Sequence, residues 1–65
     1  MSDFAARLQI ERTELADRVE KLEAFILSDR FDALPNVDRL DLREQRSHMG
    51  KYLEVLTRRV SRLCN

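Results

Sequence analysis

Apolar residues recur every three or four positions through the first 28 residues of the chain. This spacing puts them on one face of an α-helix, and no glycine or proline interrupts residues 2–28. Ser2 suits an N-cap and Asp3 suits a first helical turn. The pattern predicts a helix over about residues 2–28. Its seam is interrupted once, by the polar Arg12, and otherwise consists of Met1, Ala5, Leu8, Leu15, Val19, Leu22 and Ile26.

A turn is predicted over about residues 29–35. Serine and aspartate favour turns, and Pro35 disfavours helical geometry in the residue before it. Phe31 and Leu34 are apolar, and we expect them to fold back and plug the end of a helical pair. The next helix begins either with Pro35 in its first turn or with Asn36 as its cap.

The second predicted helix covers about residues 36–63. Its seam repeats at alternating spacings of three and four residues. The seam consists of Leu42, Gln45, Met49, Tyr52, Leu56, Arg59 and Leu63. Gly50 lies inside this helix at a cost of about 1 kcal/mol relative to alanine, which suggests that another backbone approaches closely there.

A short connection makes the two helices antiparallel neighbours, so residues 1–65 form one all-α helical-hairpin domain. Residues whose numbers sum to roughly 67 should face each other, for example Leu15 and Tyr52. Two helices cannot cover both apolar stripes, and a 65-residue domain is marginally stable. We therefore expect a homo-oligomeric bundle. Its predicted interface consists of Leu8, Leu15, Val19, Leu22, Met49, Leu53, Leu56 and Val60.

Charge is balanced overall, with twelve basic and twelve acidic residues, but residues 51–65 carry a local net charge of +3. Lys51, Arg58, Arg59 and Arg62 there either complement the helix dipole or form an anion-binding patch. With one cysteine and one histidine, neither an intrachain disulfide nor a metal site is expected. No apolar run could cross a bilayer and no secretory signal is evident, so we expect a cytoplasmic protein without cofactors.

Motifs for catalysis are missing from the sequence, so enzymatic activity is not expected. The two seams contain four polar residues, Arg12, Gln45, Tyr52 and Arg59. Each needs an explanation, because burying a polar side chain without a partner costs free energy. They either set helix register, with an arginine paired to Glu11 or Glu54, or bind a nucleotide-like anion between the helices. The sequence lacks the dense basic region of a leucine-zipper protein, which argues against nucleic-acid binding.

The pattern of apolar and polar positions extends over nearly the whole chain. Its most distinctive part is Leu-x-x-Gln-x-x-x-Met-x-x-Tyr-x-x-x-Leu-x-x-Arg, from Leu42 to Arg59. It resembles a family of very small phage and prophage helical hairpins, typified by a crAss-like phage protein of unknown role. That family usually has an acidic or serine-like cap where this chain has Pro35.

The resemblance implies a non-enzymatic phage accessory protein that acts against host defence. The leading hypothesis is sequestration of a nucleotide-derived host immune signal, such as a cyclic or ADP-ribose-type nucleotide. Its site would consist of Arg12, Gln45, Tyr52 and Arg59. A protein–protein inhibitor of a host defence complex and a structural or regulatory bundle without a small ligand are the alternatives.

Overall fold

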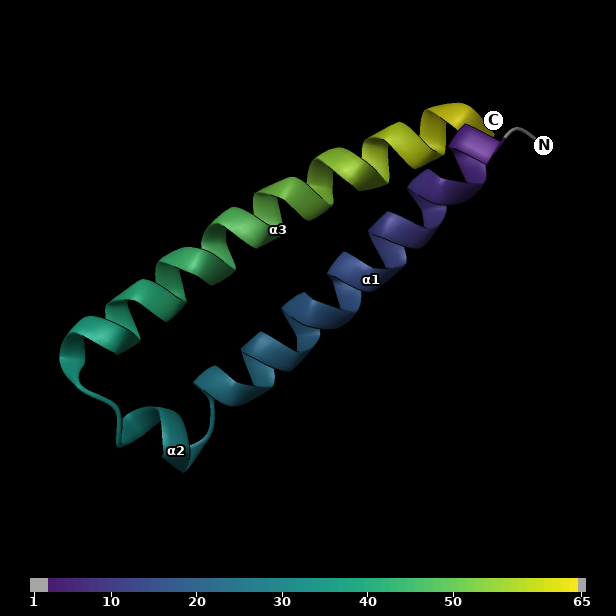
Figure 1. Cartoon of the computed structure of the whole chain (residues 1–65). Coiled ribbons are helices and arrows are strands. Elements are labelled where there is room, and N and C mark those ends of the chain that lie inside the picture. Colours follow the sequence, from purple (N-terminus) through teal and green to yellow (C-terminus); the bar gives the residue numbers. More distant parts are fainter. Residues whose placement is uncertain (1–2, 65) are drawn as a thin grey trace.

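The computed structural model describes residues 3–64, with side chains described through residue 63, and these residues contain three helices. Helix α1 spans Asp3–Ile26, the short α2 spans Asp29–Asp32, and α3 spans Asn36–Cys64. Helices α1 and α3 lie side by side and antiparallel, with α2 at one end and both termini at the other (Figure 1). The predicted all-α hairpin is confirmed. Ser2, the predicted N-cap, lies outside the described residues.

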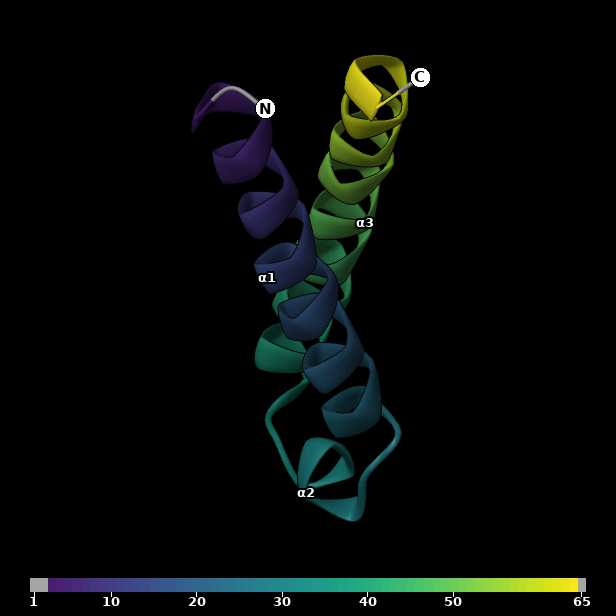
Figure 2. The ribbon, with the colours of Figure 1, turned by 90° about the vertical axis from the view of Figure 1, so that its right-hand side faces the viewer.

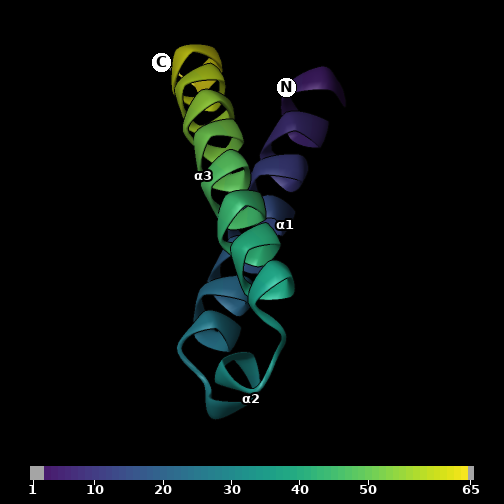
Figure 3. The same cartoon turned by 90° about the vertical axis from the view of Figure 1, so that its left-hand side faces the viewer.

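The molecule is a narrow rod, with principal extents of 47 × 15 × 15 Å. Views from the two sides show α1 and α3 crossing at an angle, with α2 closing the end opposite the termini (Figures 2 and 3). Within the described part of the chain, no helix is both long enough and apolar enough to span a membrane.

The predicted turn contains the one-turn helix α2, which the sequence pattern did not reveal. Ser28 joins it to α1: the hydroxyl donates to the Phe25 carbonyl at 2.6 Å and accepts from the Phe31 amide at 3.3 Å. One side chain therefore satisfies a carbonyl at the end of α1 and an amide at the start of α2.

Phe31 plugs the turn end of the hairpin, as predicted, and its side chain is completely buried. Its ring meets the Phe25 ring edge-on, with centroids 6.1 Å apart, and the Arg43 guanidinium lies 5.2 Å from its centroid. An edge-to-face aromatic pair and a cation–π contact each add about 0.5–1 kcal/mol beyond burial. The turn is thus a packed unit.

Pro35 occupies the position just before α3, and its carbonyl accepts the first helical hydrogen bonds from Asp38 and Arg39, both at 3.1 Å. Helix α3 begins at Asn36, whose side-chain oxygen accepts from the Arg39 guanidinium at 3.4 Å. Neither predicted alternative holds as stated, because proline supplies the cap carbonyl and asparagine is already helical.

The hydrophobic core lies between α1 and α3 of the single chain. It consists of four buried side chains, Leu8, Leu15, Val19 and Leu56, against which Met49, Leu53 and Val60 pack. Seven of the eight residues predicted at an interface between chains therefore serve the hairpin itself, and Leu22 is half-buried. Their contribution to an interface between chains stays a prediction.

The predicted seam of α3 is confirmed at Met49 and Leu56, which belong to the core, but the helix is rotated relative to the rest of that seam. Leu53 and Val60 pack against the core, whereas Gln45 and Tyr52 are exposed. The apolar stripe of α3 is wider than a heptad seam, so two rotations of the helix satisfy the period. Burying leucine and valine gains hydrophobic energy, while burying tyrosine and glutamine would leave polar atoms to satisfy.

Candidate functional site

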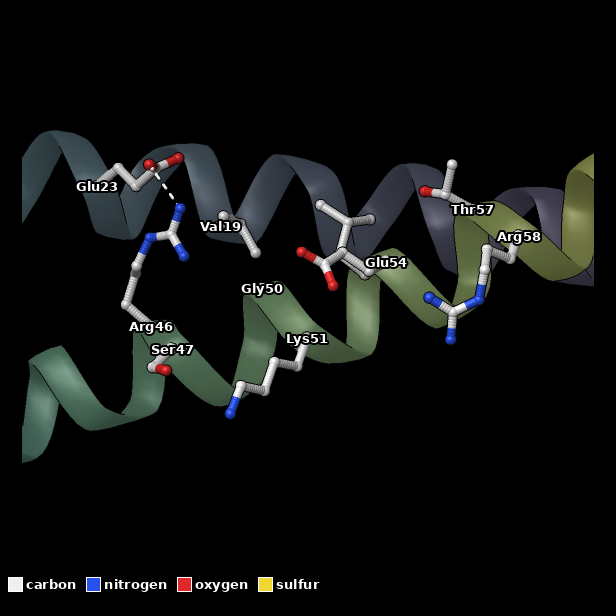
Figure 4. Close-up of a pocket in the computed structure, with 10 residues that line it drawn as sticks. Val19, Glu23, Arg46, Ser47, Gly50, Lys51, Glu54, Thr57 and Arg58 are labelled. Carbon is white, nitrogen blue, oxygen red and sulfur yellow. Dashed lines mark hydrogen bonds and ion pairs between the residues drawn. The ribbon is translucent and has the colours of Figure 1, made fainter.

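An open groove runs between α1 and α3 along the middle of the rod, with a volume of about 710 Å³ (Figure 4). Val19 and Glu23 contribute from α1, and the remaining lining comes from α3. The α3 residues recur at helical spacing on one side of that helix. They are Arg46, Ser47, Gly50, Lys51, Leu53, Glu54, Thr57 and Arg58.

Arg46 bridges the two helices at one end of the groove. Its Nη2 atom donates to Glu23 Oε2 at 2.9 Å, and both side chains are partly exposed to solvent (Figure 4). A pair in this setting contributes at most about 1 kcal/mol. Its main effect is therefore geometric: it holds a guanidinium across the groove.

Gly50 leaves space in the groove beneath this bridge. A Cβ atom at this position would lie 2.7 Å from Arg46 Nη1 and 3.7 Å from Arg46 Cζ, with no other non-neighbouring heavy atom within 4 Å apart from the helix's own backbone. The predicted approach of a second backbone is therefore not found within the described chain. Glycine instead allows the Arg46 side chain to lie back along α3 and reach Glu23.

Two cations stand on the α3 rim of the groove without a partner. Among residues 3–63, the side chain of neither Lys51 nor Arg58 makes a hydrogen bond or an ion pair. Glu54, from the same rim, is likewise unpaired within those residues. The lining therefore presents two free cations and one free carboxylate beside the paired Arg46 and Glu23, a net charge of +1.

Arg12 adds a further cation at the far end of the groove. Its Nε atom donates to Thr57 Oγ1 at 3.3 Å, and Thr57 lines the groove. The predicted alternatives, a pair with Glu11 or with Glu54, are both absent from the described residues. The Thr57 hydroxyl has a free proton to donate, so the pair offers a cation and a hydroxyl donor side by side.

The sequence of this chain matches a known family over nearly its full length. The Sequestin family model matches residues 2–62. The chain belongs to the Sequestin family. Searches of curated proteins and of solved structures found no match. The family name fits a protein that sequesters something.

The four predicted ligand residues of this Sequestin-family chain do not meet in one place. Tyr52 donates its hydroxyl to Glu11 Oε2 on one side of the hairpin, where Glu11 and Arg59 line a separate depression with Phe4 and Arg7. Arg12 belongs to the groove instead, through Thr57. The exposed Gln45 side chain donates to Met49 Sδ at 3.7 Å.

The groove residues of this Sequestin-family chain were only partly visible in its sequence. Lys51 and Arg58 belong to the basic segment for which an anion patch was one of two predicted interpretations, the other being complementation of the helix dipole, and Gly50 was noticed as unusual. Arg46 was missed, because it looks like any solvated arginine until α1 brings Glu23 opposite. Among the described residues, no cluster of three or more histidine, cysteine, aspartate or glutamate side chains could hold a metal ion.

The pKa of Tyr52 is raised above its ordinary value of 10.0, chiefly because its hydroxyl donates to the Glu11 carboxylate. Partial burial and the negative charge of Glu11 raise the pKa further, whereas Arg59 and Arg18 oppose the shift. Since the folded-state pKa lies above the unfolded one, this contribution to stability is complete below pH 10 and is lost as the pH rises through the folded value.

An ultraviolet titration at alkaline pH tests this contact, because Tyr52 is the only tyrosine in the chain. We expect the tyrosinate absorbance of the folded protein to rise with a midpoint above 10, and the midpoint to fall toward 10 in Glu11→Ala. Urea-unfolded protein is the control and should titrate near 10. Equal midpoints in folded wild type and Glu11→Ala would contradict the contact.

Proposed function

We propose that this Sequestin-family chain binds a nucleotide-derived anion in the α1–α3 groove and sequesters it without chemical change. The observation that carries the proposal is the pair of unpartnered cations, Lys51 and Arg58, on the rim of a groove that also receives Arg12 through Thr57. Cations held on one side of a groove without carboxylate partners are suited to phosphate groups. The family name supports the sequestering role.

The groove also has the mixture of surfaces that a nucleotide requires. Its volume of about 710 Å³ lies within the range of small-molecule sites, roughly 300–1,000 Å³. Leu53 and Val19 supply apolar surface for a base, while Ser47 and Thr57 supply hydroxyls for ribose or phosphate oxygens. Glu54 can accept hydrogen bonds from an exocyclic amine or a ribose hydroxyl.

We further propose that the ligand is a cyclic or ADP-ribose-type nucleotide with which a host cell signals infection, and that a phage benefits from its removal. The support for this source is the resemblance to small phage and prophage hairpins, together with the family name. Sequestration requires only tight binding, which suits a chain whose sequence shows no catalytic motif.

A thermal melt with a panel of cyclic dinucleotides and ADP-ribose-type nucleotides tests the proposal. A true ligand present at 100 times its Kd stabilises the fold by about 2.7 kcal/mol, which raises the Tm of a domain this small by roughly 10–20 °C. We expect Lys51→Met and Arg58→Met each to weaken binding about 10–100-fold, since each removes a charge-assisted hydrogen bond.

Arg30→Met is the matched control, because Arg30 is an exposed arginine on α2 and lies outside the groove. It should bind every nucleotide as the wild type does. If no nucleotide in the panel stabilises the wild type, or if Arg30→Met weakens binding as much as Arg58→Met, the groove is not the site. Ligand recovered intact after denaturing the complex would support sequestration, and a cleaved product would contradict it.

Gly50→Ala distinguishes an effect on nucleotide binding in the groove from an effect on the stability of α3. Alanine favours a helix interior by about 1 kcal/mol over glycine, but its Cβ would meet the Arg46 guanidinium at 2.7 Å. Because the obstacle is the end of a flexible side chain, we expect stability to hold or rise while nucleotide binding falls. The melts described above, carried out on this variant, report both quantities.

A second candidate function is inhibition of a host protein, and exposed apolar side chains near the turn favour it. Leu27 is 87% exposed and Leu40 is 58% exposed. Exposed apolar patches mark surfaces where proteins dock, and both residues lie within a few positions of the turn in the sequence. Nucleotide-independent counter-defence activity that is lost in Leu27→Asp but kept in Lys51→Met would favour this alternative.

A further inference from the structure

The hairpin exposes more surface than a compact chain of its size. Its accessible surface is 5089 Å², whereas a folded monomer of 7.7 kDa exposes roughly 4,300 Å². Its radius of gyration is 14.8 Å, against roughly 11 Å for a compact domain of 65 residues. The excess surface is close to the ~800 Å² that each partner buries in a standard protein interface.

One side of α3 carries a stripe of residues that is mostly exposed to solvent. Within the described chain, α1 reaches it through Glu11, which accepts from Tyr52 and lines a shallow depression with Arg59. The members of the stripe recur at helical spacing, and all are exposed except the half-buried Arg59. We define the α3 stripe as Val37, Asp41, Gln45, Val55, Arg59 and Leu63, with His48 and Tyr52 between its two halves.

Two copies of the α3 stripe are complementary to each other when the helices run antiparallel. In an antiparallel pair of α3 helices aligned so that facing residue numbers sum to 100, apolar Val37 faces Leu63, and acidic Asp41 faces basic Arg59. His48 then faces Tyr52 near the centre. Each facing pair occurs twice, as a two-fold symmetric interface requires.

The charge distribution of the whole hairpin favours the same orientation. Residues 17–50, which form the turn half, carry eight acidic and six basic residues, a net charge of −2. The remaining residues, which form the terminal half, carry four acidic and six basic residues, a net charge of +2. An antiparallel arrangement puts each positive half beside the partner's negative half, whereas a parallel one would put like charges together.

We propose that a second copy of this chain docks on the α3 stripe, antiparallel, to form a two-fold symmetric dimer. The ion pair at each end of the interface joins Asp41 of one copy to Arg59 of the other. This inference is independent of the proposed ligand site: Gly50 lies two residues before Tyr52 and so points to the opposite side of α3, which leaves both grooves open.

A charge swap across the stripe tests the proposal. Asp41 and Arg59 are eighteen residues apart in α3, or about 27 Å, so they cannot pair within one chain. We expect Asp41→Arg and Arg59→Asp each to weaken dimerisation at least about ten-fold, because each sets like charges opposite one another. The double variant should restore the dimer, since both pairs are re-formed with reversed sign.

Sedimentation equilibrium of the full chain measures these dissociation constants, and circular dichroism reports helix content. Wild type should have twice the 7.7 kDa chain mass at micromolar concentration. A monomeric wild type, or single variants that remain dimers, would overturn the proposal. If a single variant unfolds, recovery of folding and dimer in the double variant still supports the pair, and failure of that recovery refutes it.

A pair of apolar-to-charged substitutions provides a second test without touching an arginine. Val55 is 40% exposed and belongs to the α3 stripe, whereas Ile10 is 56% exposed and lies two residues from the buried Leu8, on the outer side of α1. We expect Val55→Glu to raise the dissociation constant of the dimer at least about ten-fold more than Ile10→Glu does. Equal effects of the two substitutions would exclude the stripe as the interface.

Discussion

Phe31→Ala is expected to lower the free energy of unfolding by about 3–5 kcal/mol. The Phe31 side chain is completely buried, and alanine would forfeit the edge-on contact with Phe25 and the cation–π contact with Arg43. A chain of 65 residues has a total stability of roughly 3–10 kcal/mol, so the loss is large enough to unfold much of the population. Urea denaturation followed by circular dichroism measures it.

Phe4→Ala is the matched control for this substitution. Phe4 is the same residue type but is 56% exposed near the terminal end of α1, so its loss should cost less than about 1 kcal/mol. Both variants should be compared with wild type at one protein concentration, because self-association contributes to apparent stability. Similar losses for Phe4→Ala and Phe31→Ala would show that the turn is not the packed unit described above.

Leu56→Ala is expected to cost about 2–5 kcal/mol, because Leu56 is completely buried at the centre of the α1–α3 core. The cavity left behind would lie among Leu8, Leu15 and Val19, so the contact between the two long helices should loosen. Thermal and urea melts should both shift, with helix content lost in one transition.

Leu27→Ala provides the comparison for Leu56→Ala, since Leu27 is 87% exposed and alanine removes the same atoms from solvent rather than from a core. We expect its stability to stay within about 0.5 kcal/mol of wild type. The interior position of Leu56 would be refuted by a loss no greater than that of Leu27→Ala.

The two long helices and the break between them were determined by the sequence itself, because local interactions decide them. A period of three to four residues in apolar positions, without glycine or proline before residue 28, is sufficient to predict α1. Pro35 and the serine and aspartate residues before it stop one helix and start the next. The role of Phe31 as a plug followed from an apolar residue inside a polar turn.

The rotation of α3 was decided only by the tertiary structure. Its apolar stripe is broad enough to present either Tyr52 and Arg59 or Leu53 and Val60 to α1, and sequence period alone does not distinguish them. Packing against Leu8, Leu15 and Val19 selects the apolar pair, because polar atoms facing that surface would lose their hydration.

The location of the groove follows from that same rotation. Once Leu53 and Val60 face α1, Arg46 comes opposite Glu23 and Arg12 reaches Thr57, while Tyr52 turns to Glu11 on the other side. These pairs join residues 23 to 45 positions apart. A sequence specifies such contacts only through the packing of the whole hairpin, which is why the helices could be predicted from their residues and the groove could not.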